Sequence, residues 1–237
     1  MNPITVTGHR GAMAHAPENT APSLALAQQH GADEIELDIR LSSDGVPVVI
    51  HDATLARVTD EARSDLVADL TWAELGAVEL AGGARLLRFE EVLEQTELPL
   101  QVELKAPGAA EVVGTVLDER TADRDRCLLT SFHLDYLIKV GEVMPWANRG
   151  FIVFDYTEEA LAQAVELGAQ TLFSGWPGLT AEAVERIHDQ GLRAGGWLLD
   201  DEPRARLAVE VGVDAVTADD PRAARAWLDA ARAEAAA

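Results

Sequence analysis

Cysteine and basic residues are scarce in this 237-residue chain, and each scarcity excludes a class of protein. The single cysteine, Cys127, rules out an intramolecular disulfide and favours a reducing compartment. Lysine and arginine together number 19 against 41 acidic residues, which gives a formal charge of −22. A surface of that sign repels nucleic acid and anionic lipid headgroups. We therefore expect no nucleic-acid partner and no stable membrane association.

Long apolar runs are missing as well, although 48% of the residues are hydrophobic, enough for a large core. No run approaches the ~20 residues that a membrane span needs. The first residues also lack a charged-then-apolar leader. These absences predict a cytoplasmic protein, and they leave its oligomeric state open.

The stretch 33–52 combines a strand pattern with an unusual run of charge. An Asp44-Gly45 turn separates two β-rich runs, the second of which ends at His51-Asp52. Because side chains alternate along a strand, one face is apolar: Ile35, Leu37 and Ile39. The other face is charged: Glu34, Glu36, Asp38 and Arg40. Neighbouring carboxylates repel one another and are costly to bury unpaired, so a bound cation is our hypothesis for this face.

Strands and helices alternate along the whole chain. Eight strands are predicted, at Ile4–Thr7, 34–41 with an extension to His51, Leu100–Leu104, Cys127–Thr130, Arg149–Phe154, Thr171–Ser174, Arg193–Leu199 and Ala215–Thr217. This alternation predicts an α/β fold, a (β/α)8 TIM barrel. We expect a single domain over residues 1–237, with residues 52–88 as a short insertion after the second strand. An open doubly wound sheet is the alternative, weakened because no Gly-x-Gly-x-x-Gly or Walker-type loop follows a strand.

Three acidic residues from two neighbouring strands would meet where the active site of such a barrel lies, at the carboxyl ends of its strands. Glu36, Asp38 and Glu103 offer hard oxygen ligands, which suit one divalent cation, Mg²⁺ or Ca²⁺. A salt-bridge cluster with Arg40 and Lys105 is the alternative. The convergence of three carboxylates favours the metal.

Two histidines, His9 and His51, are predicted at the same end of the barrel, where the strands have their carboxyl ends. A pair of imidazoles can supply one base and one acid near neutral pH, although a lone histidine more often only bonds locally. The other four histidines are given local structural roles, with His133 as a reserve candidate: His15, His30, His133 and His188. Arg10 and Lys105, cations in an acidic chain, would hold a phosphate group. Trp197 would either stack on a substrate or fill the barrel mouth.

A series of short motifs runs through nearly the whole chain. It comprises His9-Arg10-Gly11, Pro17-Glu18-Asn19-Thr20, Gly31-Ala32-Asp33, Ile35-Glu36-Leu37-Asp38, Val48-Val49-Ile50-His51-Asp52, Glu103-Leu104-Lys105, Ser131-Phe132 and Ala218-Asp219-Asp220-Pro221. The series closely resembles the glycerophosphodiester phosphodiesterase family. This resemblance implies a TIM barrel, a divalent cation, and hydrolysis of a glycerophosphodiester to glycerol 3-phosphate and an alcohol. It also implies roles for matching residues: His9 and His51 in catalysis, Glu36, Asp38 and Glu103 as metal ligands, and Arg10 and Lys105 beside the phosphate.

Three departures from the family pattern lie in the insertion or at the rim of the site. They are Ala56-Arg57-Val58-Thr59-Asp60 without the usual Thr-Thr-x-Gly, Leu87-Arg88-Phe89 in place of Ile-Pro-Thr-Leu, and Asp200 in place of Asn. These departures leave the identity of the alcohol open. Also open are which histidine is the acid, and whether water or the glycerol 2-hydroxyl attacks.

Two rival functions are considered. One is a lysophospholipase D or sphingomyelinase D-like lipid phosphodiesterase, against which the charge of −22 counts. The other is a non-catalytic phosphodiester-binding barrel, against which the intact set of histidines, carboxylates and Lys105 counts.

Overall fold

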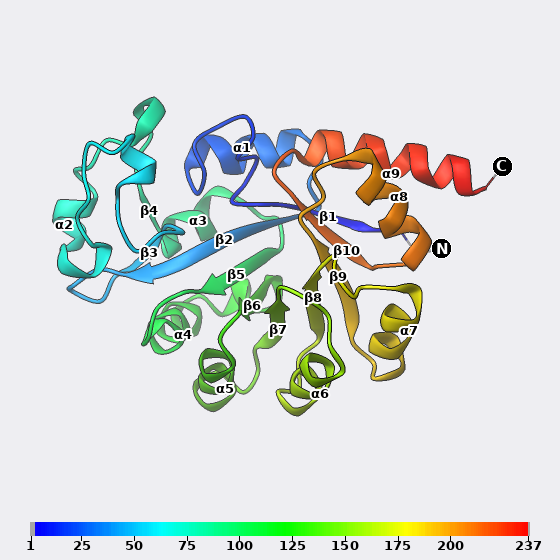
Figure 1. Ribbon diagram of the computed structural model, residues 1–237. Coiled ribbons are helices and arrows are strands. Elements are labelled where there is room, and N and C mark those ends of the chain that lie inside the picture. Colours follow the sequence, from blue (N-terminus) through cyan, green and yellow to red (C-terminus); the bar gives the residue numbers. More distant parts are fainter. Residues whose placement is uncertain (1–2, 237) are drawn as a thin grey trace.

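The computed structural model describes residues 3–236, in which eight parallel strands form a closed barrel (Figure 1). The barrel strands are β1 (Thr5–Gly8), β2 (Glu34–Leu41), β5 (Leu100–Leu104), β6 (Cys127–Ser131), β7 (Asn148–Val153), β8 (Thr171–Gly175), β9 (Arg193–Trp197) and β10 (Ala215–Ala218). Neighbours pair in parallel around the ring, and β1 pairs with both β2 and β10. This closure confirms the predicted TIM barrel and excludes the open doubly wound sheet.

A helix follows each barrel strand in the chain, as the predicted alternation requires. These helices are α1 (Ala21–Gln29), α3 (Phe89–Gln95), α4 (Ala109–Glu119), α5 (Leu134–Val143), α6 (Glu158–Glu166), α7 (Ala181–Asp189), α8 (Glu202–Val211) and α9 (Pro221–Ala235). Side-chain caps start several of them; Asp220, for example, accepts the backbone N–H groups of Arg222 and Ala223. No helix in residues 3–236 is long and apolar enough to cross a membrane.

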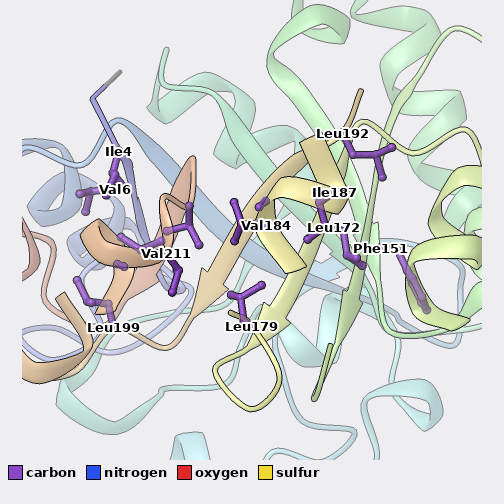
Figure 2. Close-up of a cluster of buried hydrophobic side chains, with 14 of the residues drawn as sticks. Ile4, Val6, Phe151, Leu172, Leu179, Val184, Ile187, Leu192, Leu199 and Val211 are labelled. Carbon is purple, nitrogen blue, oxygen red and sulfur yellow. The ribbon is translucent and has the colours of Figure 1, made fainter. Parts of the chain in front are cut away.

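The main core lies between the strands and the surrounding helices. Ile35, Leu37 and Ile39 of β2 are fully buried there against α1, α3 and α4, as the alternation on this strand predicts. Figure 2 shows the second large cluster, between the strands β7 to β10 and β1 and the helices that cover them. Inside the barrel, Phe173 of β8 lies so close to its neighbours that only glycine fits: a Cβ at Gly150 would be 2.8 Å from the ring, and one at Gly195 would overlap it.

The insertion extends β2 away from the barrel (Figure 1, cyan to teal). Just before the insertion, β3 (Pro47–Val49) pairs antiparallel with β2, and β4 (Leu87–Arg88) at the end of the insertion pairs antiparallel with β3. Between β3 and β4 lie α2 (Trp72–Leu75) and three short 3₁₀ helices: Arg57–Thr59, Val67–Asp69 and Ala81–Gly83. A small apolar cluster joins the insertion to the β3 arm, formed by Val48, Ile50, Leu55, Val67, Leu75, Val78, Leu80, Ala84 and Leu86. The cluster explains how a segment with little regular secondary structure is held together.

Candidate active site

A pocket of about 550 Å³ opens at the carboxyl ends of the barrel strands. Seven of the eight predicted site residues line it: His9, Arg10, Glu36, His51, Glu103, Lys105 and Trp197. The eighth, Asp38, is 1% exposed and lies beneath them, within ion-pair distance of Arg10 and Lys105. The fold therefore brings the whole predicted set together.

Three carboxylates form the floor of the site. Glu36 and Asp38 are two residues apart on β2, so their side chains share the face that points into the barrel. Asp38 lies opposite Glu103 of the neighbouring strand β5 in the pairing register. One oxygen from each residue lies within 4.8 Å of the other two. Burial, followed by the charges of Asp38 and Glu103, raises the pKa of Glu36 well above its ordinary value. Burial would also raise the pKa of Asp38, but ion pairs with Lys105 and Arg10 lower it overall.

The carboxylates fit a divalent cation. Two buried oxygens accept no hydrogen bond from the described residues: Oε1 of Glu36, and Oδ1 of Asp38, which lies 3.3 Å from Lys105 Nζ in an ion pair. A cluster of hard oxygen donors with unsatisfied lone pairs is what Mg²⁺ and Ca²⁺ bind in proteins. The rival salt-bridge cluster is correct only in part. Lys105 Nζ does lie 2.8 Å from Glu103 Oε1, but Arg40 donates instead to the backbone carbonyl oxygens of His51 and Lys105.

Each of the two candidate catalytic histidines is held by an aspartate. His9 Nδ1 lies 2.6 Å from Asp219 Oδ1, and His51 Nδ1 lies 2.6 Å from Asp52 Oδ1. An ionised carboxylate can only accept, so each Nδ1 donates and each Nε2 is left for other chemistry. Burial lowers the pKa of His51, and the charge of Asp38 partly offsets that shift. Both aspartates belong to motifs found in the sequence, Asp52 directly beside His51 and Asp219 in Ala218-Asp219-Asp220-Pro221, but the pairing of Asp219 with His9 needed the structure.

An ion-pair network connects the insertion to the charged side of the pocket. Arg57 Nε donates to Asp52 Oδ2 at 2.7 Å, and Arg57 Nη2 donates to Glu18 Oε1 at 3.0 Å. Arg10 Nη1 in turn donates to Glu18 at 3.2 Å. The hydrogen bond from Arg57 is the main reason that the pKa of Asp52 lies far below its usual range. Arg57 and Glu18 thus join Asp52 and Arg10 through one chain of contacts that sequence analysis did not find.

Two residues near the carboxylates have left-handed backbone conformations. Arg10 has φ 50° and Asn19 has φ 57°, and the backbone N–H of Asn19 donates to Arg10 O at 3.0 Å. Such strain costs roughly 1–3 kcal/mol per residue and persists only where the surroundings enforce it. Here it places two donors: Arg10 N on Glu36 Oε2 at 3.0 Å, and Asn19 Nδ2 on Asp38 Oδ2 at 2.8 Å. Asn19 belongs to the Pro-Glu-Asn-Thr motif, but its role needed the structure.

Aromatic rings form the opposite side of the pocket. Phe132, Phe154 and Trp197 pack with ring centroids 4.8–5.7 Å apart. Trp197 Nε1 donates to Val153 O at 3.2 Å, which fixes the indole, whereas Phe154 is 70% exposed. Trp197 therefore lies at the barrel mouth, as predicted. The reserve candidate His133 lines the pocket as well, with its ring 4.8 Å from that of Tyr136.

The remaining histidines lie outside the pocket lining. His188 lies in the last turn of α7, and its Nε2 is 2.8 Å from Asp214 Oδ2. His15 and His30 lie near each other beside α1, with ring centroids 5.0 Å apart. These positions agree with roles outside the predicted catalytic set.

Fold and site together define a TIM barrel whose mouth combines two histidine–aspartate pairs, three buried carboxylates and two cations. The profile of the Glycerophosphoryl diester phosphodiesterase family matches residues 9–223, and the chain belongs to this family. It is therefore a phosphodiesterase, as the sequence motifs predicted. Members of the family depend on a divalent metal, for which the Glu36–Asp38–Glu103 cluster is the candidate site.

Similar proteins extend over nearly the whole chain. The chain is 28% identical to a glycerophosphodiester phosphodiesterase of Caldanaerobacter subterraneus subsp. tengcongensis and 29% identical to one of Bacillus altitudinis, each over 91% of this chain and 94% of that protein. Among solved structures, an Oleispira antarctica phosphodiesterase in complex with the product sn-glycerol-3-phosphate is similar, with a TM-score of 0.84 and 27% identity, over 95% of this chain and 96% of that one. A Thermotoga maritima glycerophosphodiester phosphodiesterase has a TM-score of 0.81 and 26% identity, over 94% and 97%.

Proposed function

We propose that this chain hydrolyses glycerophosphodiesters to glycerol 3-phosphate and an alcohol, and that residues 1–237 act as one barrel domain with 52–88 as its insertion. The observation that carries the proposal is the convergence of three buried carboxylates, two histidine–aspartate pairs and two cations on one pocket. The product-bound Oleispira antarctica structure supports the substrate class. The same complete set counts against a barrel that only binds phosphodiesters.

Glu36, Asp38 and Glu103 would hold one divalent cation, Mg²⁺ or Ca²⁺, which supplies positive charge against the non-bridging phosphate oxygens when bound. Arg10 and Lys105 would bind the same oxygens. Both side chains are only 12–13% exposed and are already held near the carboxylates by ion pairs. A phosphate entering the pocket would therefore meet positive groups that need little reorganisation.

His9 and His51 would move the protons. One Nε2 would take the proton of the attacking oxygen, from water or the glycerol 2-hydroxyl, while the other would give a proton to the alkoxide as its P–O bond breaks. Asp219 and Asp52 would each accept from Nδ1–H. The base would then start as neutral imidazole with Nε2 free, and the acid as imidazolium with a proton on Nε2 as well. The aspartates thus act through the histidines.

The aromatic side would receive the leaving alcohol. The rings of three residues could contact a choline group or the start of an acyl chain: Phe132, Phe154 and Trp197. Because Phe154 is 70% exposed, a lysophospholipase D or sphingomyelinase D-like activity is kept as the second candidate.

The proposal also includes a reducing cellular compartment, as predicted from the single cysteine. Cys127 is a free, buried thiol, and we expect a cytoplasmic enzyme.

The deciding experiment is turnover of glycerophosphocholine with Mg²⁺, with Ca²⁺ and after exhaustive chelation, with lysophosphatidylcholine assayed in parallel. We expect metal-dependent release of glycerol 3-phosphate and choline. If lysophosphatidylcholine is turned over and glycerophosphocholine is not, the enzyme is a lysophospholipase D-like phosphodiesterase rather than a glycerophosphodiester phosphodiesterase. Absence of turnover on several glycerophosphodiesters with either metal would refute the proposal.

A further inference from the structure

Two histidines and an aspartate meet on the outer side of the barrel, apart from the residues that line the active-site pocket. His15 lies in the loop before α1, His30 ends α1, and Asp220 caps the start of α9 (Figure 1). His15 Nε2 is 2.7 Å from Asp220 Oδ2, and one possible ligand atom from each of the three residues lies within 4.8 Å of the others. The grouping joins parts of the chain that are about 200 residues apart in sequence.

The backbone around each of the three residues is fixed. His30 N donates to Leu26 O at 2.8 Å, and His15 N donates to Ala12 O at 3.0 Å. Asp220 uses Oδ1 to accept two backbone N–H groups of α9, which leaves Oδ2 directed to His15. The groups are therefore held by two helix ends and a hydrogen-bonded loop.

The geometry of the two imidazoles fits a shared metal ion. With Zn–N bonds of ~2.0–2.1 Å and a tetrahedral angle, two zinc-bound imidazoles have ring centroids about 5 Å apart. The centroids of His15 and His30 are 5.0 Å apart, with their planes at 79°. In addition, Nδ1 of His30 is buried and has no hydrogen-bond partner among residues 3–236. A hydrogen bond explains the His15–Asp220 contact but does not explain why a second imidazole adjoins it.

The donor set selects a different class of metal from the active-site carboxylates. Two imidazole nitrogens and one carboxylate oxygen suit Zn²⁺ and similar ions, whereas three carboxylates suit Mg²⁺ or Ca²⁺. Arg222 in the first turn of α9 places a positive charge near His30, which opposes the binding of a cation, but its side chain is exposed and therefore screened by water.

We propose that His15, His30 and Asp220 form a second metal site, which binds Zn²⁺ or a similar transition-metal ion with water completing the coordination. The ion would hold the end of α1 to the start of α9. Because Asp219 precedes Asp220 and bonds to His9, the same ion would stabilise the segment that positions one active-site histidine. The site is distinct from the carboxylate cluster in its residues and in its metal preference.

The test is calorimetric titration of the whole protein with ZnCl2 in excess Mg²⁺, which keeps the carboxylate cluster occupied. We expect one zinc ion per chain and a higher melting temperature with zinc. His15→Ala and His30→Ala should each weaken zinc binding at least ~10-fold. Their melting temperatures without zinc, together with the Co²⁺ absorption spectrum of each variant, separate loss of a ligand from loss of the fold.

His188→Ala is the matched control, because His188 makes the same kind of contact with Asp214 at 2.8 Å but is not part of a three-ligand cluster. This variant should bind zinc like the wild type. Equal zinc affinity in wild type, His15→Ala and His30→Ala would overturn the proposal. Absence of zinc binding to the wild type in excess Mg²⁺ would overturn it as well.

Discussion

The two sides of the barrel mouth differ in how firmly their side chains are held. On the charged side, supplied mainly by β1, β2 and β5, Glu36, Asp38 and Glu103 are at most 8% exposed, and Arg10 and Lys105 already pair with them. On the aromatic side, supplied by β6, β7 and β9, Phe154 is 70% exposed. In the proposed function, the rigid side would bind the phosphate, whose chemistry is the same in every substrate. The open side would then accept different alcohols without disturbing the charged side.

The largest effect is expected from a carboxylate of the charged side. Glu36→Gln should lower kcat/KM about 10³-fold, since a bound metal contributes several kcal/mol to transition-state stabilisation. The fold should persist, because the change removes one charge from a cluster in which like charges already repel. Metal titration and kinetics measure the effect, and chelation of the wild type should abolish activity.

Glu34→Gln is the control for that variant, because Glu34 lies on the same face of β2 at the opposite end and bonds to Gln101. Its activity should stay near the wild-type value. Full activity of the wild type after exhaustive chelation would remove the metal from the proposal.

The two histidines should give the next largest effect. His9→Ala and His51→Ala should each lower kcat ~10²-fold or more, with little change in melting temperature. The wild-type rate should be bell-shaped in pH. His188→Ala serves as the control, because His188 lies on the surface in the last turn of α7. If either active-site variant keeps near-normal turnover, that histidine has only a structural role.

Lys105→Arg should cost about 2 kcal/mol in transition-state stabilisation, or roughly 30-fold in kcat/KM. Lys105 Nζ fits between Glu103 Oε1 at 2.8 Å and Asp38 Oδ1 at 3.3 Å, a space suited to a compact ammonium and too small for a planar guanidinium. Lys139→Arg is the control, because Lys139 is exposed and pairs with Glu142 on α5. If Lys105→Arg has wild-type kinetics, Lys105 only balances the charge of the neighbouring carboxylates.

The contrast between the two sides also explains what could be predicted from the sequence. Alternation along β2 places Glu36 and Asp38 on one face whatever the rest of the chain does, so a local pattern was sufficient. The alternation of eight strands with helices likewise predicted the closed barrel. The position of Glu103 followed because parallel strands align their carboxyl ends.

Other contacts depend on long-range geometry that no local pattern encodes. Asp219 reaches His9 across 210 positions only because β10 pairs with β1 in the register that places Ala218 beside Gly8. Arg57 reaches Glu18 because the insertion, held together by its apolar cluster, lies beside the loop before α1. The roles assigned to the predicted site residues remain predictions that the variants above test.

Arg57→Gln tests how the insertion is connected to the charged side. The native pKa of Asp52 is lowered mainly by Arg57, so this contribution to stability is present above the unfolded pKa of ~3.9 and is lost as pH falls below it. At pH 7 the variant should lose about 1 kcal/mol in the free energy of unfolding, since both ion pairs of Arg57 are partly exposed.

That loss should shrink as the pH is lowered toward 3, as measured by denaturant unfolding at several pH values. Arg63→Gln is the control, because the ion pair of Arg63 with Asp65 lies entirely within the insertion and does not reach the charged side of the pocket. The Arg63→Gln variant should have the kcat of the wild type. A loss in Arg57→Gln that does not depend on pH would mean that packing, rather than charge, connects the insertion to the barrel.

The smallest effect is expected on the aromatic side, from Phe154→Ala. Phe154 contacts the rings of Phe132 and Trp197 but is 70% exposed, so its removal should barely change the melting temperature. One aromatic contact with the alcohol is worth roughly 0.5–1.5 kcal/mol, which predicts a 2- to 10-fold rise in KM at nearly constant kcat. The rise should be largest for the alcohol that the ring contacts, so glycerophosphocholine, glycerophosphoglycerol and lysophosphatidylcholine are compared. Ile138→Ala, exposed on α5 outside the pocket lining, is the control. An equal fall in kcat for all three substrates would show that Phe154 supports the charged side, and the division of the mouth into a phosphate side and an alcohol side would be wrong.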